Sequence, residues 1–258
     1  MALIKKFRIK SFREQEPVLE LEKISMFYNK RQIINNLSLK INTQEVLGML
    51  GPNGVGKSTI FHIITGLKDP SYGRVLINGF DCTKLPIYER ATRFKLGYVP
   101  QYGGFIQDLS LIENLKLVAE IHIKEKDLRQ AKIEKLISQF EFESILKLKG
   151  KHLSGGQKKK LVISMALIND PNILLLDEPF AALDILTIKM LQEIIINLQS
   201  LEKITVVVCD HQARDLLSCV DRALVLSNGK IIASGSPNEI INDSTARSAY
   251  FGDEFKIN

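Results

Sequence analysis

The strongest structural signal in this chain is the segment EVLGMLGPNGVGKSTIFHIITGL (residues 45–67). An apolar run at 45–50 leads into a glycine loop, and the residues after the loop have the apolar spacing of a helix. Within it, GPNGVGKS (51–58) matches the pattern GxxxxGK[ST], which binds phosphate when a strand precedes it and a helix follows. Because both flanks are present, the segment predicts a phosphate-binding loop in a nucleotide-binding α/β domain.

The chemistry of this phosphate loop (residues 51–58) follows from its composition. Glycines let backbone N–H groups curl around phosphate oxygens. Lys57 is expected to reach the β and γ phosphates, and the hydroxyl of Ser58 is expected to bind Mg²⁺. The predicted nucleotide-binding residues of this segment are Gly51, Pro52, Asn53, Gly54, Val55, Gly56, Lys57, Ser58 and Thr59.

The flanking sequence predicts a sheet on either side of this loop. Alternating apolar and polar residues at 18–28 and 33–42 favour a small antiparallel sheet, and 73–79 and 96–101 are further short strands. Continuous apolar strands at 172–177, 204–210 and 222–235 indicate a parallel sheet covered on both faces, and a helix at 184–201 separates the first two. Residues from about 108 to 168 have helical spacing and charged faces, which predicts an inserted helical subdomain at about 102–168.

Composition limits the class of protein. The 258 residues are 45% hydrophobic and 25% charged, which is typical of a soluble globular chain. The longest apolar runs, such as 173–176, are too short to cross a bilayer, and the first residues lack the apolar core of a secretory signal. We therefore expect a cytosolic chain. Cys82, Cys209 and Cys219 form no CxxC pair, so neither a metal site nor a disulfide is expected.

The net charge of +6 is unevenly distributed. Lys5, Lys6, Arg8, Lys10 and Arg13 all precede the first acid, so residues 14–258 carry only 30 − 29 = +1. A near-neutral body argues against nucleic acid as a partner. The basic segment 1–16 is interpreted either as a solvated tail or as an arm on an anionic membrane surface.

A pair of carboxylates ends the apolar run ILLLDEP (173–179). At the carboxyl edge of a parallel sheet, and with a phosphate loop upstream, Asp177 is expected to hold Mg²⁺. Glu178 is expected to act as the general base on the attacking water. Adjacent side chains of a strand point to opposite faces, which suits two separate roles.

A second candidate anion site lies at LSGGQKKK (153–160). Two glycines disfavour the interior of a helix by about 1 kcal/mol each, whereas bare N–H groups at a helix start attract anions. LSGGQ, 177 − 154 = 23 residues before the acid pair, is the signature of ATP-binding-cassette (ABC) ATPases, and the chain resembles this family from about residue 18 to its end. The resemblance implies a head-to-tail dimer in which Ser154, Gly155, Gly156 and Gln157 contact the ATP held by a second copy.

The resemblance assigns further roles by position. Tyr28 corresponds to an aromatic residue that stacks on adenine, and Gln101 to a glutamine that contacts Mg²⁺ and water. Asp184 belongs to a loop that crosses the dimer interface, and His211 corresponds to the switch histidine on the γ-phosphate. The remaining histidines are expected to be structural or at the surface, and Lys158, Lys159 and Lys160 are expected to form a solvated helix start.

Within the family, LLLDEPFAALD (174–184) and YFGDEF (250–255) resemble the LptB subfamily of lipopolysaccharide-export ATPases. Ala182 to Ile185 depart from the Gly-Val-Asp-Pro of that subfamily. The expected partners are a second copy, two integral-membrane permease subunits and the cytoplasmic face of the inner membrane. A branched-chain amino-acid importer ATPase and a permease-free cassette remain alternatives. The apolar stripe Leu109, Ile112, Leu115 and Val118 is expected to pack partly on the core and partly against a permease.

The resemblance also sets the expected domain boundaries. A basic tail at 1–16 is followed by an ABC ATP-binding domain at 17–243 and by a C-terminal tail at 244–258.

Overall fold

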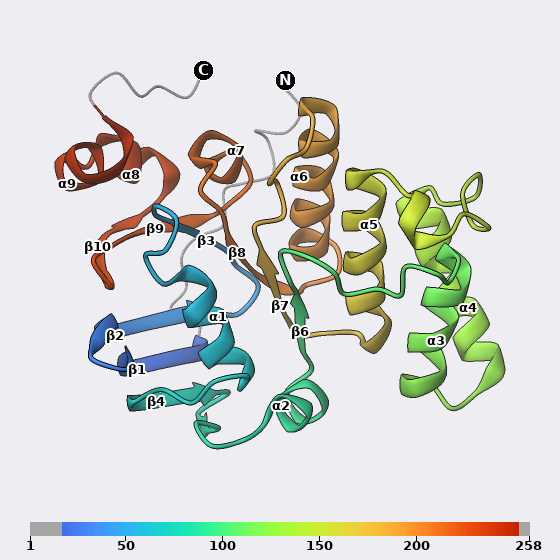
Figure 1. Cartoon of the computed structure of the whole chain (residues 1–258), viewed down its shortest axis with the longest axis horizontal. Helices are drawn as coiled ribbons and strands as arrows, with labels where there is room; N and C mark the ends of the chain where they lie inside the picture. The colour runs from blue at the N-terminus through green and yellow to red at the C-terminus, as the bar shows by residue number, and fades with distance from the viewer. Residues whose placement is uncertain (1–16, 253–258) are drawn as a thin grey trace.

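The computed structural model describes residues 17–252 and contains two β-sheets and the helices that pack against them (Figure 1). The larger sheet has the strand order β10-β9-β3-β8-β7-β6. Neighbouring strands from β9 to β6 are parallel, whereas β10 runs antiparallel to β9. The predicted parallel sheet is confirmed. Its strands are β3 (Val46–Leu50), β6 (Leu96–Val99), β7 (Ile173–Asp177), β8 (Thr205–Cys209), β9 (Arg222–Ser227) and β10 (Lys230–Gly235).

The smaller sheet is antiparallel and has the order β2-β1-β4-β5. It contains the predicted N-terminal strands, here β1 (Pro17–Tyr28) and β2 (Arg31–Asn42), followed by β4 (Tyr72–Ile77) and the short β5 (Phe80–Asp81). Side chains along β1 and β2 alternate between buried and more exposed positions, as the sequence pattern predicted. In Figure 1 this sheet lies at one end of the molecule, and the helices of the insertion lie at the other.

Helices account for most of the remaining chain. The insertion contains α3 (Leu111–His122), α4 (Lys126–Phe140) and α5 (Gly155–Ala166), as predicted. The sequence did not predict α2 (Ile87–Arg93), α7 (Ala213–Leu217), α8 (Pro237–Asn242) or α9 (Ser244–Ala246), because these segments are too short for apolar periodicity to develop. The other elements are α1 (Lys57–Thr65), α6 (Ile185–Ser200), the 3₁₀ turns Gly150–His152 (η2) and Leu167–Asn169 (η3), and the π-helical turn Arg247–Phe251 (η4).

The large sheet separates two hydrophobic cores. Alternate residues of each strand face opposite sides, so Leu47 and Met49 pack with the small sheet and α1, whereas Val46 and Leu50 pack with α3, α5 and α6. Both faces of the central strands are therefore dry, which explains why β3, β7 and β8 are apolar throughout. None of the helices formed by residues 17–252 is both long and apolar enough to span a membrane.

A buried arginine joins α1 to α2. Arg90 is 0% exposed, and its guanidinium donates to the carbonyls of Ile63 and Ile64 at 2.7 and 2.8 Å. It also donates to the carbonyls of Leu85 and Thr83 at 2.8 and 2.9 Å. Arg90 thus donates to two carbonyls at the end of α1, of which that of Ile63 also accepts from the Gly66 N–H, and it connects α1 to α2.

We expect Arg90→Met to lower the free energy of unfolding by about 2–3 kcal/mol, because buried carbonyls lose a charged donor that methionine cannot replace. Urea unfolding followed by circular dichroism measures this loss. Arg93→Met is the matched control: Arg93 is on the same helix, exposed, and paired with Glu89 at 3.4 Å. Surface pairs of this kind contribute about 0–1 kcal/mol. Equal losses for the two variants would contradict the assignment.

Candidate active site

The phosphate loop connects the end of β3 to the start of α1. Gly51 and Gly56 have φ values of 155° and 113°, which side-chain-bearing residues rarely adopt. A Cβ on Gly51 would also lie 2.7 Å from the carbonyl oxygen of Leu226. Gly56 is the N-cap of α1 and provides no side-chain cap, so the first N–H groups of this helix remain available to an anion.

Lys57 is folded back onto the loop that precedes it. Its ammonium donates to the carbonyls of Gly51 and Pro52 at 2.7 and 3.2 Å, and the residue is 4% exposed. The cation therefore lies inside the ring formed by the loop, where a nucleotide phosphate would provide further acceptors. The predicted contact of Lys57 with the β and γ phosphates stays a prediction.

Asp177 ends β7 and accepts three hydrogen bonds. Its donors are the Ser58 hydroxyl (3.2 Å), the Tyr98 hydroxyl (3.3 Å) and the Cys209 thiol (2.8 Å). Burial and the neighbouring Asp177 carboxylate raise the pKa values of Tyr98 and Cys209, so both groups keep their protons and donate. The sequence did not identify Tyr98 and Cys209 as site residues, although both lie on strands that end beside predicted ones.

The oxygen atoms of Ser58 and Asp177 suit a magnesium ion. Mg²⁺ prefers hard oxygen ligands and keeps several waters or phosphate oxygens around it. The Ser58 hydroxyl and the Asp177 carboxylate, 3.2 Å apart, offer one such oxygen each beside the phosphate loop. The donor set therefore fits the ion that the sequence predicted.

Glu178 follows the strand end in a left-handed conformation, with φ of 46°. This turn, rather than strand alternation alone, directs its carboxylate away from that of Asp177. The Glu178 Oε2 accepts from the side-chain amide of Gln101 at 2.7 Å and lies 3.5 Å from Nδ1 of His211. Gln101, Glu178 and His211 follow β6, β7 and β8, so the carboxyl edge of the parallel sheet brings the three predicted residues together.

His211 is also in contact with the end of the chain. The Tyr250 hydroxyl in η4 donates to the His211 carbonyl at 2.6 Å. Burial, followed by the charge of Asp210, raises the pKa of Tyr250 to about 12, so the hydroxyl stays protonated. Residues 244–252 were expected to form part of a tail, but they form α9 and η4 and reach the site. Residues 253–258, the rest of that tail, lie outside the described residues.

The signature segment (residues 153–157) begins α5. Ser154 is its N-cap: its hydroxyl accepts from the Gln157 N–H at 3.2 Å, and the Gln157 side chain accepts from the Ser154 N–H at 2.8 Å. A Cβ on Gly156 would lie 2.5 Å from Cγ2 of Thr187, so glycine is required for α5 to pack against α6. Ser154 and Gly155 are exposed. Among residues 17–252 no hydrogen bond joins this segment to the phosphate loop.

The lysines after the signature segment differ from their predicted role. The ammonium of Lys159 donates to the backbone carbonyl of Gln101 at 2.8 Å, and that of Lys160 to the carbonyl of Phe140 at 2.9 Å. The prediction of a solvated helix start is therefore wrong for these two residues. Each is long enough to reach across from α5 and satisfy a carbonyl of a neighbouring segment.

The other predicted residues lie at the edges of the site. Tyr28 ends β1 and is 37% exposed, with the Lys68 ammonium 4.9 Å above its ring. Asp184 is the N-cap of α6, and hydrogen bonds from Thr187 lower the pKa of its carboxyl. Of the remaining histidines, His62 is half-buried, and its ring lies edge-on to Tyr98, whereas His122 and His152 are exposed.

The stripe expected to pack partly on the core and partly against a permease packs on the core at three of its four positions. Leu115 is 0% exposed, and Ile112 and Val118 contact the same cluster. The amphipathic pattern was correct, but α3 uses it to join the insertion to the large sheet. Exposed apolar side chains near Gln101 are instead Tyr102 and Ile106, at 81% and 48%.

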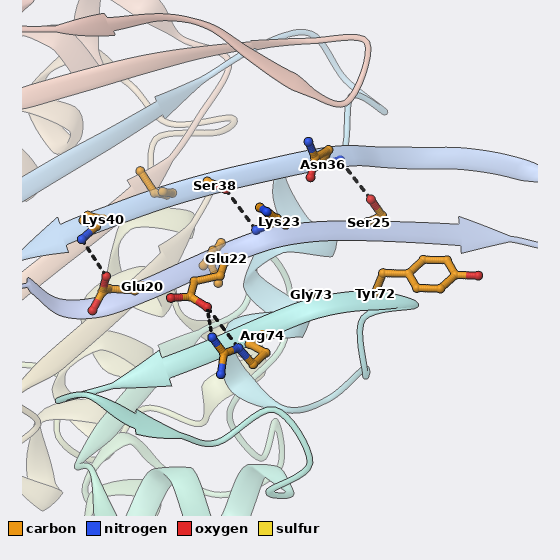
Figure 2. A pocket seen from close by; sticks show the side chains of 12 residues that line it. Glu20, Glu22, Lys23, Ser25, Asn36, Ser38, Lys40, Tyr72, Gly73 and Arg74 are labelled. Atoms are coloured by element: carbon orange, nitrogen blue, oxygen red, sulfur yellow. Dashed lines mark hydrogen bonds and ion pairs between the residues drawn. The ribbon is translucent and has the colours of Figure 1, made fainter.

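A hollow of about 830 Å³ lies away from this site, on the small sheet (Figure 2). Its two acids are paired: Glu20 with Lys40 at 3.0 Å, and Glu22 with Arg74 at 2.6 Å. These partners leave no carboxylate in it available to a ligand, so we assign no function to this hollow.

The parallel sheet, the phosphate loop and the carboxylates at the strand ends together define a nucleoside triphosphatase with a phosphate loop. Comparison with known proteins narrows this class. The model of the ABC transporter family matches residues 34–181. The lipopolysaccharide export system ATP-binding protein LptB of Haemophilus influenzae is 36% identical over 244 residues, which cover 93% of this chain and 99% of that protein.

Two solved structures are similar over most of the chain. An ATP-binding cassette of an ABC transporter has a TM-score of 0.82 at 25% identity and covers 92% of this chain and 99% of its own. A dimeric post-hydrolysis cassette bound to ADP and Pi has a TM-score of 0.77 at 28% identity, with 85% and 98% covered. The chain belongs to the ABC transporter family, in which it is the ATP-binding, ATP-hydrolysing subunit. The predicted family, fold and enzyme class are confirmed.

Proposed function

We propose that this protein is the motor of a lipopolysaccharide exporter and works as a head-to-tail dimer beneath two integral-membrane permease subunits. The observation that carries this proposal is the 36% identity to an LptB protein along 99% of that protein's length. The relative is named as part of a lipopolysaccharide export system. The domain boundaries at 17–243, with a helical subdomain at about 102–168, are part of the same proposal.

In the proposed mechanism the phosphate loop and Lys57 bind the β and γ phosphates of ATP, and Tyr28 stacks on the adenine. Ser58 and Asp177, with Gln101, would hold Mg²⁺, which would neutralise charge on the phosphates. Glu178 accepts the proton of the attacking water. Support for this role comes from its burial and its position 2.7 Å from the Gln101 amide, which keeps its carboxylate oriented.

His211 is proposed to contact the γ-phosphate beside Glu178. Its Nδ1 lies 3.5 Å from the Glu178 carboxylate and 3.6 Å from that of Asp210. Both carboxylates therefore lie beside the same ring nitrogen, and the Tyr250 hydroxyl holds the His211 backbone carbonyl. The assembled residues thus position a water, a base and a charge-stabilising donor around one phosphate.

The dimer is proposed because the signature segment is exposed at its start and makes no hydrogen bond to the phosphate loop within residues 17–252. Ser154 and Gly155 are exposed at the start of α5, and Ile185 and Leu186 beside Asp184 are 73% and 79% exposed. Head-to-tail pairing would place both surfaces against the nucleotide and phosphate loop of a second copy. This accounts for two anion-binding segments in one chain.

The location and partners belong to the same proposal. We place the protein on the cytoplasmic face of the inner membrane, where the permeases would hold it. The basic segment 1–16, for which a membrane-surface role was one interpretation, lies outside the described residues. A branched-chain amino-acid importer and a permease-free cassette are the competing functions.

A pull-down from native membranes tests the partner. We expect the tagged protein to be recovered with two different permease subunits of a lipopolysaccharide exporter, because a chain of this class needs membrane subunits to couple ATP hydrolysis to transport. Mass spectrometry of the bound proteins is the measurement. Recovery of amino-acid importer permeases would support the first alternative function, and recovery of soluble partners alone would contradict a role in transport.

A further inference from the structure

Lys159 connects α5, the helix that begins with the signature segment, to Gln101, which belongs to a different motif. It lies in the first turns of α5, and its ammonium donates to the Gln101 carbonyl at 2.8 Å. Burial lowers the pKa of Lys159, whereas the nearby Asp177, Asp210 and Glu178 act in the opposite direction. The amine is therefore half-buried among the carboxylates of its own chain, although it belongs to the helix that begins with the signature segment.

Gln101 makes hydrogen bonds through both its backbone carbonyl and its side-chain amide. Its backbone carbonyl accepts from Lys159, and its side-chain amide donates to Glu178 Oε2 at 2.7 Å. Lys159 follows Ser154, the N-cap of α5, by five positions, which is about 7.5 Å along the helix at 1.5 Å per residue. A rigid turn of helix thus links the exposed signature serine to the glutamine that contacts the proposed base.

We propose that Lys159 is a positioning residue that ties α5 to the backbone of Gln101 and so sets the position of the Gln101 amide against Glu178. When α5 moves toward the nucleotide of a second copy, Lys159 carries that movement to Gln101 in its own site. This transmission of movement rests on the proposed function, because it assumes that Ser154 contacts the ATP of the second copy.

Steady-state ATP hydrolysis by the full-length protein tests the positioning role. We expect Lys159→Met to lower kcat about tenfold, since small misplacement of a catalytic contact is costly, and to leave KM for ATP within about twofold. Lys159→Arg should restore most of kcat, because arginine also reaches the carbonyl. Lys158→Met is the matched control: it removes the adjacent lysine, whose side chain makes no hydrogen bond to residues 17–252. Equal effects at the two positions would overturn the proposal.

A double-mutant cycle separates positioning from a general structural effect. Gln101→Ala removes the amide that contacts Glu178 but keeps the carbonyl that accepts from Lys159. If Lys159 acts through this amide, Lys159→Met should cause no further loss of kcat in the Gln101→Ala background. Fold losses that multiply would show independent action and overturn the proposal. Thermal unfolding of each variant shows whether any loss of kcat comes from unfolded protein.

ATP-dependent dimerisation distinguishes this proposal from the proposed function. Gel filtration of Glu178→Gln with ATP should give a dimer, and Glu178→Gln combined with Lys159→Met should give one too. If Glu178→Gln stays monomeric with ATP, the head-to-tail dimer is wrong, and so is the transmission step through α5. The positioning step is then still decided by the double-mutant cycle of Lys159 and Gln101. If both dimers form and the losses multiply, only the role of Lys159 is wrong.

Discussion

Glu178→Gln should retain ATP binding and lower hydrolysis by at least ~10²-fold, the scale on which general acid–base catalysis contributes. Glutamine has the shape of glutamate, and its carbonyl oxygen can still accept from the Gln101 amide, so the site should keep its geometry. It cannot take a proton from water, however. Bound ATP then remains uncleaved between two copies, and a stable dimer should appear in gel filtration with light scattering.

The chain offers a matched control for this substitution. Glu202 accepts from the side-chain amide of Gln139 at 2.7 Å, the same distance as between Glu178 and Gln101. It lies just before β8, at the opposite edge of the large sheet from the site. Glu202→Gln should therefore hydrolyse ATP like the wild type. Turnover in Glu178→Gln within about threefold of wild type would rule out Glu178 as the base.

Mixed dimers should reveal that each ATP site is built from two chains. Lys57→Ala removes the phosphate-binding cation, and Ser154→Arg blocks the helix start that the second copy's nucleotide would meet. A dimer with one chain of each kind has one intact site, because the normal phosphate loop of the Ser154→Arg chain meets the normal signature segment of the Lys57→Ala chain. Its other site carries both defects. With Glu178→Gln in both chains, so that bound ATP is not cleaved, we expect about one trapped ATP per mixed dimer.

Different affinity tags on the two chains allow the mixed dimer to be isolated, and retained radiolabelled ATP counts the intact sites. Dimers of either variant alone should retain almost none. Ser236→Arg is the control for cap loss, because Ser236 is the N-cap of α8 with the same capping box as Ser154. A mixed dimer of one Ser236→Arg chain and one Lys57→Ala chain should retain as much ATP as a mixed dimer of one wild-type chain and one Lys57→Ala chain. Two equally inactive sites in the Ser154→Arg mixture would mean that the signature segment acts in its own chain.

Much of this fold could be predicted because local sequence and global structure agree. The run from β3 through the phosphate loop into α1 carries its own strand, turn and helix signals, and the acids after β7 follow from strand position. The family resemblance assigned Gln101 and His211 to the same site as Glu178. The carboxyl edge of the parallel sheet, which gathers residues that are far apart in sequence, explains why the structure brings the three together.

The residues that could not be predicted from the sequence are those whose roles depend on tertiary contacts, which no local pattern encodes. Lys159 was expected in solvent because three lysines at a helix start usually are, yet its length and the approach of the Gln101 segment bring the amine to a carbonyl. Cys209 and Tyr98 gave no motif, because their function here is to donate to Asp177 from neighbouring strands. Arg90 likewise gave no signal, since only the packing of α1 against α2 shows that its guanidinium has four carbonyl partners.

The hydrogen bond from Tyr250 to the His211 carbonyl has an evolutionary consequence. The stretch that matches the ABC transporter family model ends at residue 181, whereas Tyr250 is close to the end of the chain. Sequence change in the last helices can therefore alter the backbone position of His211, the proposed switch residue, even when every shared motif is unchanged. If His211 has its proposed role, two cassettes with identical phosphate loops and acid pairs would differ in switching through their C-terminal helices, and exchanging these helices between paralogues would exchange that difference.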